Sequence, residues 1–172
     1  ALPILLTVLA QLLGAYMKVV LNGSRLLAPV ERGFFRLAGI NAEKGHTWWQ
    51  YTLNMLAFNG IGLLVLYGIL RVQGRLPLNP QGFAGMEASL ALHTAISFVT
   101  NTNGQAYSGE AALSYFSQAV GLGAQNFLSA ATGMALLLAI IRGITARQAK
   151  NLGNYWVDMV RSTLYVLLPL SF

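Results

Sequence analysis

The polar stretch Thr100-Asn101-Thr102-Asn103-Gly104-Gln105 separates two apolar segments of the chain. Residues 86–99 before it are mostly apolar, and residues 111–141 after it carry no formal charge. Small polar residues and a glycine between hydrophobic segments are typical of a re-entrant loop whose backbone carbonyls replace the water shell of an ion. Gly104 is expected to give this loop backbone conformations that other residues avoid. The stretch therefore predicts an ion-binding loop at membrane depth.

The composition is that of a membrane protein. Of 172 residues, 55% are hydrophobic and 9% are charged, whereas a typical soluble domain has roughly 25% charged residues. The net charge of +6 is scattered near the ends of the apolar segments, which indicates membrane topology and not nucleic-acid binding. The absence of cysteine excludes disulfide and thiolate chemistry. Because the chain starts at Ala1 and stops inside an apolar run, we expect it to be a fragment of a longer protein.

Four apolar segments are candidates for membrane-spanning helices, which need about 20 apolar residues to cross about 30 Å of hydrocarbon. They are residues 1–21, the stretch between Lys44 and Arg71, the stretch between Glu110 and Arg142, and residues 155–172. The first three are predicted to span, and the last is predicted to be a truncated span. Residues 86–99 would be about 21 Å long as a helix. They are therefore too short to span and are typical of a re-entrant half-helix.

The basic residues predict the orientation in the membrane. They gather in two connections, one with Lys18, Arg25, Arg32, Arg36 and Lys44 and the other with Arg142, Arg147, Lys150 and Arg161. Connections rich in Lys and Arg face the cytoplasm. The start of the chain and the connection after Arg71 are then expected to face outside.

These features together predict an all-α membrane protein. We expect a leading helix at 1–21 and a cytoplasmic connection at 22–50. A helix–pore loop–helix unit is expected at 51–141, with a pore helix at about 86–99 and a filter at 100–105. A second cytoplasmic connection is expected at 142–154, followed by a truncated membrane-spanning helix at 155–172.

The predicted filter would bind a cation through its backbone. The carbonyls of Asn101, Thr102, Asn103 and Gly104 are expected to be directed at the ion, assisted by the partially negative C-terminal end of the preceding helix. An ordinary extracellular loop after an interfacial helix is an equally open interpretation of these residues. Glu110 either attracts cations to an outer mouth or only stabilises the start of a helix, for which Ser108 is the predicted N-cap.

Polar residues inside the predicted spans favour structural roles. Gln118, Gln125 and Ser129 have spacings of seven and four and are predicted to share one helix face, where interhelical hydrogen bonding is favoured over direct ion contact. Asp158 and Arg161 are three residues apart and are predicted to pair with each other.

Catalytic residues are not expected in this chain. His93 in the short helix is interpreted as a packing residue and not as a titrating gate, and Glu87 as a helix-stabilising residue. The sequence has no phosphate-binding glycine loop with Lys, no phosphorylatable Asp motif, no metal-ligand cluster and no nucleophile–base pair.

The segment Ser97-Phe-Val-Thr-Asn-Thr-Asn-Gly-Gln-Ala-Tyr-Ser-Gly-Glu110 closely resembles the first filter segment of the KdpA family, the potassium-translocating subunits of Kdp pumps. The resemblance extends over nearly the whole chain. It includes Leu76-Pro-Leu-Asn-Pro80, Leu113-Ser-Tyr-Phe-Ser-Gln118, Gln125-Asn-Phe-Leu-Ser-Ala-Ala131 and Leu152-Gly-Asn-Tyr-Trp-Val-Asp158.

The resemblance implies a fold of the potassium channel and transporter type. It also implies a subunit of ten transmembrane helices, with one leading helix and four helix–pore–helix units around a single filter. This chain would supply the leading helix, the first unit and the start of the second. The filter maps onto Thr100, Asn101, Thr102, Asn103, Gly104 and Gln105, with potassium held by the carbonyls of Asn101 to Gly104. Potassium is the implied transported ion.

The resemblance also implies partners in a bacterial inner membrane. They are the ATP-hydrolysing P-type ATPase subunit KdpB, the single-anchor subunit KdpC and the small single-span subunit KdpF, surrounded by lipid. Potassium would enter from the extracellular or periplasmic side. A Trk- or Ktr-like potassium transporter or channel without ATP coupling is the first alternative, and a non-conducting membrane assembly module is the second. The long sequence matches favour the pump subunit.

Overall fold

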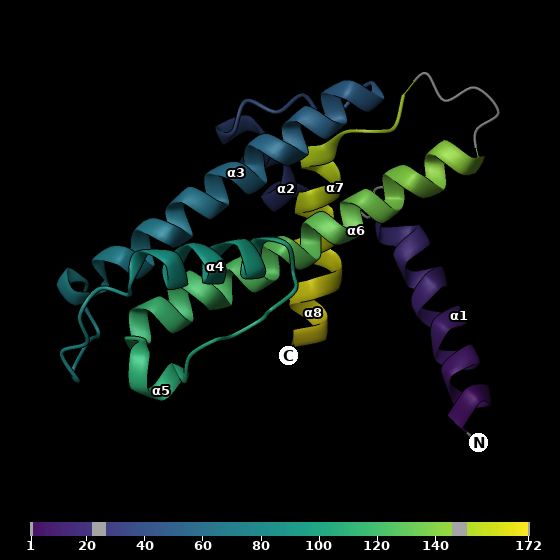
Figure 1. Ribbon diagram of the computed structural model, residues 1–172. Coiled ribbons are helices and arrows are strands. Elements are labelled where there is room, and N and C mark those ends of the chain that lie inside the picture. The colour runs from purple at the N-terminus through teal and green to yellow at the C-terminus, as the bar shows by residue number, and fades with distance from the viewer. Residues whose placement is uncertain (1, 22–26, 146–150, 172) are drawn as a thin grey trace. The chain divides into compact units, whose positions relative to one another are not determined.

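The structure is a computed structural model that describes residues 2–21, 27–145 and 151–171. Its elements are all helical within these ranges (Figure 1): α1 Leu2–Leu21, α2 Ala28–Leu37, α3 Trp48–Val72, η1 Gln73–Arg75, α4 Ala88–Val99, α5 Gly109–Ala112, η2 Ser117–Gly123, α6 Ala124–Thr145, α7 Tyr155–Arg161, η3 Ser162–Leu167 and α8 Leu168–Ser171. The predicted all-α class is confirmed. Three of the basic residues used for the orientation, Arg25, Arg147 and Lys150, lie outside the described residues.

Three helical stretches are long and apolar enough to cross a membrane: Leu2–Leu21, Trp48–Arg75 and Ser117–Thr145. In the most apolar 18 residues of each stretch, only 11% to 22% of the residues are buried inside the protein. Large apolar side chains therefore remain exposed along these helices, as lipid contact requires. Helix α4 is the one shorter apolar helix of 10–17 residues in the described chain. The chain is therefore a membrane protein.

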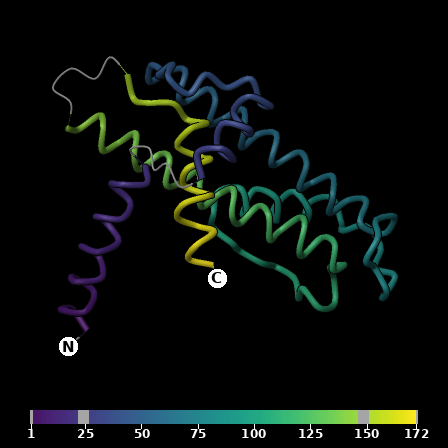
Figure 2. Tube along the Cα trace, turned by 180° about the vertical axis from the view of Figure 1, so that it is seen from behind, coloured from purple at the N-terminus to yellow at the C-terminus, as the bar shows by residue number. Residues whose placement is uncertain are grey.

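The chain forms two compact units, Trp48–Gly133 and Ala1–Thr47 with Met134–Phe172. Helix α6 runs from the first of these into the second. In the unit 48–133, α4 packs against α3, which the figures show from two sides (Figures 1 and 2). The core between them contains Leu66, Leu70, Met86, Ala91, Ala95, Phe98, Leu113 and Leu122. Because alanine lies at two of the α4 positions, the helices can approach closely.

Buried Gln73 holds the chain on either side of α4. Its Nε2 donates to the carbonyls of Ala84 and Ala112, both at 2.8 Å, and its Oε1 accepts from the amide of Ser114 at 3.3 Å. The side chain is 1% exposed, and all its hydrogen-bonding groups are used. A buried amide without these partners would be costly. Gln73 therefore fixes the segment that enters α4 and the segment that leaves the filter.

The predicted third span is interrupted near its start. Helix α5 ends at Ala112, Leu113 is extended, and a helix resumes at Tyr115. From Ser117 to Gly123 this helix is the π-helix η2. Figure 2 shows the extended chain that connects α4 to α5 before this helix. A π-helical turn changes the faces of the residues that follow it.

In the unit of residues 1–47 and 134–172, the pairing predicted between Asp158 and Arg161 is wrong. Asp158 forms an ion pair with Arg142 of α6, and Arg161 forms one with Glu31 of α2. Glu31 is 5% exposed and also accepts from the Tyr165 hydroxyl at 3.2 Å. Helix α2 itself was not predicted within the connection 22–50. Each of these two charges therefore pairs with a residue of another element and not with the other charge. A charge that the fold removes from water needs a partner, and the fold places that partner beside it.

Candidate functional site

Glu87 positions the start of the short helix α4 as its N-cap. Its carboxylate accepts from the amides of Ser89 at 2.9 Å and Leu90 at 3.0 Å. The Ser89 hydroxyl and then these amides lower the pKa of Glu87 from 4.5 to about 2. The helix-stabilising interpretation of Glu87 agrees with this geometry. His93 lies exposed further along the same helix.

We expect Glu87→Ala to lower the thermal unfolding midpoint of the complete protein at neutral pH, since the amides of the first turn lose their acceptor. The folded pKa of about 2 lies below the ordinary 4.5. The cap therefore contributes its full stability above pH 4.5 and loses it as the pH falls toward 2. The difference between wild type and variant should shrink over that range, measured by thermal scans. Glu43→Ala, at an exposed carboxylate, is the control. A pH-independent difference would contradict the capping role.

Ser97 holds the predicted filter at the end of α4. Its carbonyl accepts from the amides of Thr102 at 2.8 Å and Asn103 at 3.2 Å. Its hydroxyl accepts from the amide of Gly104 at 2.6 Å. One buried residue, 6% exposed, therefore binds three successive backbone amides of the loop. Ser97 was not among the predicted site residues, because a serine at the end of a helix is too common to indicate this function.

The three hydrogen bonds from loop amides to Ser97 determine the direction of three backbone carbonyls. The described chain contains no cis peptide bond, and in a trans peptide the C=O points opposite to the N–H of the next residue. Because the amides of Thr102, Asn103 and Gly104 point at Ser97, the carbonyls of Asn101, Thr102 and Asn103 point away from it. A row of backbone oxygens facing one side of a loop can replace water around a cation.

The left-handed positions of the loop are asparagines and not the glycine. Asn101 has a φ of 57° and Asn103 a φ of 55°, whereas Gly104 is not among the positive-φ glycines of the described chain. The expectation that Gly104 supplies the unusual backbone conformation is wrong. Asparagine tolerates this conformation better than most side chains, and its alternation with Thr102 lets successive amides face Ser97. Gly104 is needed for space, since a Cβ there would lie 3.3 Å from Ser97 Oγ.

The C-terminal carbonyls of α4 are used by the loop itself. Those of Ile96 and Phe98 accept from the amides of Thr100 at 2.9 Å and Asn101 at 3.3 Å, and the carbonyl of Ser97 is occupied as described above. These bonds compete with the predicted role of the helix end as a direct partner of the cation. The loop carbonyls, and not the helix terminus, are the better candidate ligands.

Ser108 is the N-cap residue of α5, as predicted, but its side chain makes no capping bond to the helix backbone. Its hydroxyl donates to Glu110 Oε2 at 2.9 Å, because the carboxylate two residues on is the stronger acceptor. Hydrogen bonds from the Glu110 amide and then from Ser108 lower the pKa of Glu110. Glu110 is exposed and ionised, as an outer-mouth residue would be, and that role stays a prediction.

The helix after the filter contacts it through Ser129, whose hydroxyl lies 3.3 Å from Asn101 Oδ1. The single face predicted for Gln118, Gln125 and Ser129 is not observed. Gln118 lies in a pocket with Asn103 and Gln105, whereas Gln125 lies beside Gly62 in a groove against α3. The π-helical turn between Gln118 and Gln125 separates them, because it breaks the 3.6-residue period on which the prediction relied.

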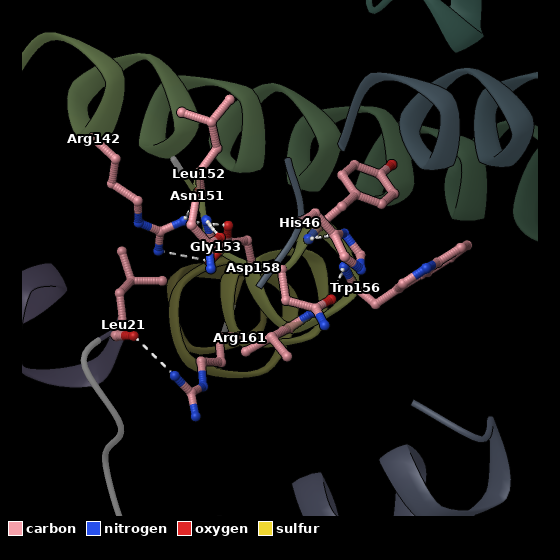
Figure 3. Close-up of polar contacts among 12 residues, drawn as sticks. Leu21, His46, Arg142, Asn151, Leu152, Gly153, Trp156, Asp158 and Arg161 are labelled. Atoms are coloured by element: carbon pink, nitrogen blue, oxygen red, sulfur yellow. Dashed lines mark hydrogen bonds and ion pairs between the residues drawn. The ribbon is translucent and has the colours of Figure 1, made fainter. Parts of the chain in front are cut away.

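A second polar cluster lies in the unit of residues 1–47 and 134–172 (Figure 3). Arg142 donates to both carboxylate oxygens of Asp158, at 2.5 and 2.8 Å, and to the carbonyl of Leu152 at 2.9 Å. His46 exchanges backbone bonds with Leu152 and Gly153. Burial, and then the charge of Lys44, lower the pKa of His46. The cluster joins two predicted cytoplasmic connections.

The family model for the potassium-transporting ATPase A subunit, KdpA, matches residues 1–172. The chain belongs to the KdpA family. The family resemblance inferred from the filter segment and its flanking motifs is thereby confirmed.

Individual relatives agree with the family match. A potassium-transporting ATPase potassium-binding subunit of Allorhizobium ampelinum is 58% identical over 92% of this chain. Proteins of the same name from Pseudomonas putida and Pseudomonas aeruginosa are 57% and 56% identical over 92% and 96% of it. The chain spans about 29% of the length of the relatives in the first two cases and 30% in the third.

Within the described residues, no group of three or more His, Cys, Asp or Glu side chains could hold a metal ion. The candidate site of this KdpA-family chain is the set of backbone carbonyls of the loop after α4. Ser97 supports the loop from one side, and Ser129 of α6 supports it through Asn101.

Proposed function

We propose that this chain is part of the potassium-binding and translocating subunit of an ATP-driven potassium uptake pump, and that Thr100 to Gln105 form the first quarter of its filter. The observation that carries the proposal is the row of three amides bonded to Ser97, which turns the carbonyls of Asn101, Thr102 and Asn103 to one side. Gly104 and Gln105 are included in the proposed filter because they directly follow these residues. Potassium is the transported ion, and no other cofactor is proposed.

The proposed setting is the bacterial inner membrane, with the chain start and the filter connection on the outer side. The basic residues of the two other connections support this orientation. Membership in the KdpA family supports KdpB, KdpC and KdpF as partners. It also favours a pump subunit over a Trk- or Ktr-like transporter and over a non-conducting module, and it assigns ATP hydrolysis to the partner.

We expect Gly104→Val to weaken potassium binding by the complete pump by about tenfold or more. A Cβ at Gly104 lies 3.3 Å from Ser97 Oγ, so the two added methyl groups of a β-branched residue would break the 2.6 Å bond between Ser97 and the Gly104 amide. Losing such a bond and leaving a partly buried amide unpaired costs about 1–3 kcal/mol, and 1.4 kcal/mol is tenfold in affinity. Gly104→Ala should have a smaller effect.

The measurements are potassium binding to the purified complex and potassium-limited growth of cells that depend on it. Gly68→Val is the matched control, because a Cβ at Gly68 has no atom within 4 Å. Unchanged binding and growth in Gly104→Val would reject the filter assignment and favour a membrane assembly module.

A further inference from the structure

A polar pocket of about 330 Å³ lies beside the filter segment, within the unit of residues 48–133. Its polar side chains are the carboxamides of Asn103, Gln105, Gln118 and Asn126, and Phe98 and Leu122 are among the apolar residues of its wall. Two of the carboxamides belong to the filter segment itself, and the other two come from η2 and α6. No lining side chain carries a formal charge. The pocket is therefore a neutral, oxygen- and nitrogen-lined space that adjoins the candidate ion site.

The acceptor Asn126 Oδ1 is buried and has no hydrogen-bond donor among the described residues. A buried carbonyl oxygen without a donor costs about 1–3 kcal/mol. The amide donors of two neighbouring side chains are directed elsewhere: Gln118 Nε2 donates to the backbone carbonyls of Gly109 and Leu113, and Gln105 Nε2 lies 3.5 Å from the Tyr107 hydroxyl. These two amide groups therefore do not donate to Asn126 Oδ1 in this structure, and this oxygen requires a donor that is not a protein group among the described residues.

The turn of α6 that carries Asn126 is already connected to the filter. Its backbone carbonyl accepts from the Ser129 hydroxyl at 3.2 Å, and the same hydroxyl lies 3.3 Å from Asn101 Oδ1. A second connection through the Asn126 side chain would hold the loop at Asn103 and Gln105 as well. The loop would then be supported by Ser97 at its amides and by α6 at its side chains.

We infer that this pocket holds ordered water molecules, which donate to Asn126 Oδ1 and bridge it to the carboxamides of Asn103 and Gln105. A buried water needs about 10–15 Å³ and two to four polar partners, and the pocket supplies several times that volume and four carboxamides. Water fits better than a cation, because it can both donate to the oxygens and accept from the amide groups. Asn126 is thus a positioning residue that acts on the filter through water. This inference rests on the proposed filter function.

The test uses the complete pump and the variants Asn126→Leu and Asn126→Asp. Leucine has a similar volume but no acceptor, whereas aspartate keeps the acceptor oxygen. We expect Asn126→Leu to reduce the ratio of potassium to rubidium affinity about fivefold, the equivalent of one water-mediated hydrogen bond. Asn126→Asp should restore the ratio, because an added charge attracts both ions equally. Gln125→Leu, at a neighbouring carboxamide outside the pocket, is the control for general effects on α6.

High-resolution maps of the wild-type complex in potassium and in thallium identify the occupant. Density in the pocket that is equal in both salts, and is lost in Asn126→Leu, would support water. Density that strengthens with thallium would overturn the inference in favour of a bound cation. An unchanged affinity ratio in Asn126→Leu would overturn the positioning role. These outcomes differ from failure of the proposed function, which would appear as unchanged potassium binding in Gly104→Val.

Discussion

Replacing Ser97 by alanine is expected to weaken potassium binding by the complete pump by about tenfold. The substitution removes the acceptor of the Gly104 amide, 2.6 Å away, and leaves that amide unpaired beside a residue that is 6% exposed. An unpaired buried donor costs about 1–3 kcal/mol, which corresponds to about a factor of ten in affinity. The backbone carbonyl of Ser97 remains, so the amides of Thr102 and Asn103 keep their acceptor. The loss of potassium affinity should therefore be smaller than the loss that a complete collapse of the loop would cause.

The measurement is the potassium dependence of binding and of ATP hydrolysis by the purified complex. Ser89→Ala is the matched control, because Ser89 lies on the same helix and its hydroxyl contacts Glu87 and not the filter. Ser97→Ala should also alter the ratio of potassium to rubidium affinity, since a loosened loop fits the two ions less selectively. Equal affinities in Ser97→Ala and Ser89→Ala would show that the hydroxyl does not position the filter.

The second large effect is expected for Asp158→Asn, which should destabilise the unit of residues 1–47 and 134–172 by about 1–2 kcal/mol, between the values for exposed and for fully buried ion pairs. The Asp158 side chain is 4% exposed and binds the Arg142 guanidinium through both oxygens. Asparagine keeps the shape and removes the charge, so the Arg142 side chain, 35% exposed, loses its counter-charge. We expect the thermal unfolding midpoint of the complete protein in detergent to fall by several degrees.

A double-mutant cycle separates this pair from general effects of lost charge. Arg142→Gln combined with Asp158→Asn should be less destabilising than the sum of the single variants, because neither charge is then left without its partner. Glu43→Gln, which removes an exposed carboxylate, should leave the midpoint unchanged. Additive single effects would mean that the ion pair contributes nothing of its own.

The helical elements of this chain could be predicted because the lipid environment restricts the choices. Long charge-free segments such as residues 48–70 must satisfy their backbone internally, and a helix does so within one segment. The short apolar stretch before Thr100 was predicted as a half-helix for the same reason, and α4 spans Ala88–Val99. Helix α2 and the break at Leu113 were missed, because neither changes the hydropathy pattern.

The location of the candidate site could also be predicted, but its internal geometry could not. The filter motif marked Thr100 to Gln105, whereas the function of Ser97 depends on where the loop folds back in space. Gly104 was expected to adopt the special backbone conformation, and Asn101 and Asn103 adopt it instead. Which residues adopt a positive φ depends on which backbone amides can reach Ser97 at the same time. The conformational preferences of single residues do not determine this.

The amino-acid sequence by itself determined the membrane class, the three long helices, the short helix α4 and the KdpA family, because hydrophobic length and local motifs are properties of consecutive residues. The tertiary structure decided which charges pair, which face each carboxamide of η2 and α6 occupies, and that one serine binds three amides of the loop after α4. Those outcomes depend on contacts between residues distant in the chain, as when Arg161 pairs with Glu31 and not with its neighbour Asp158. Burial makes an unpaired charge or amide costly, so the packed structure selects the partner.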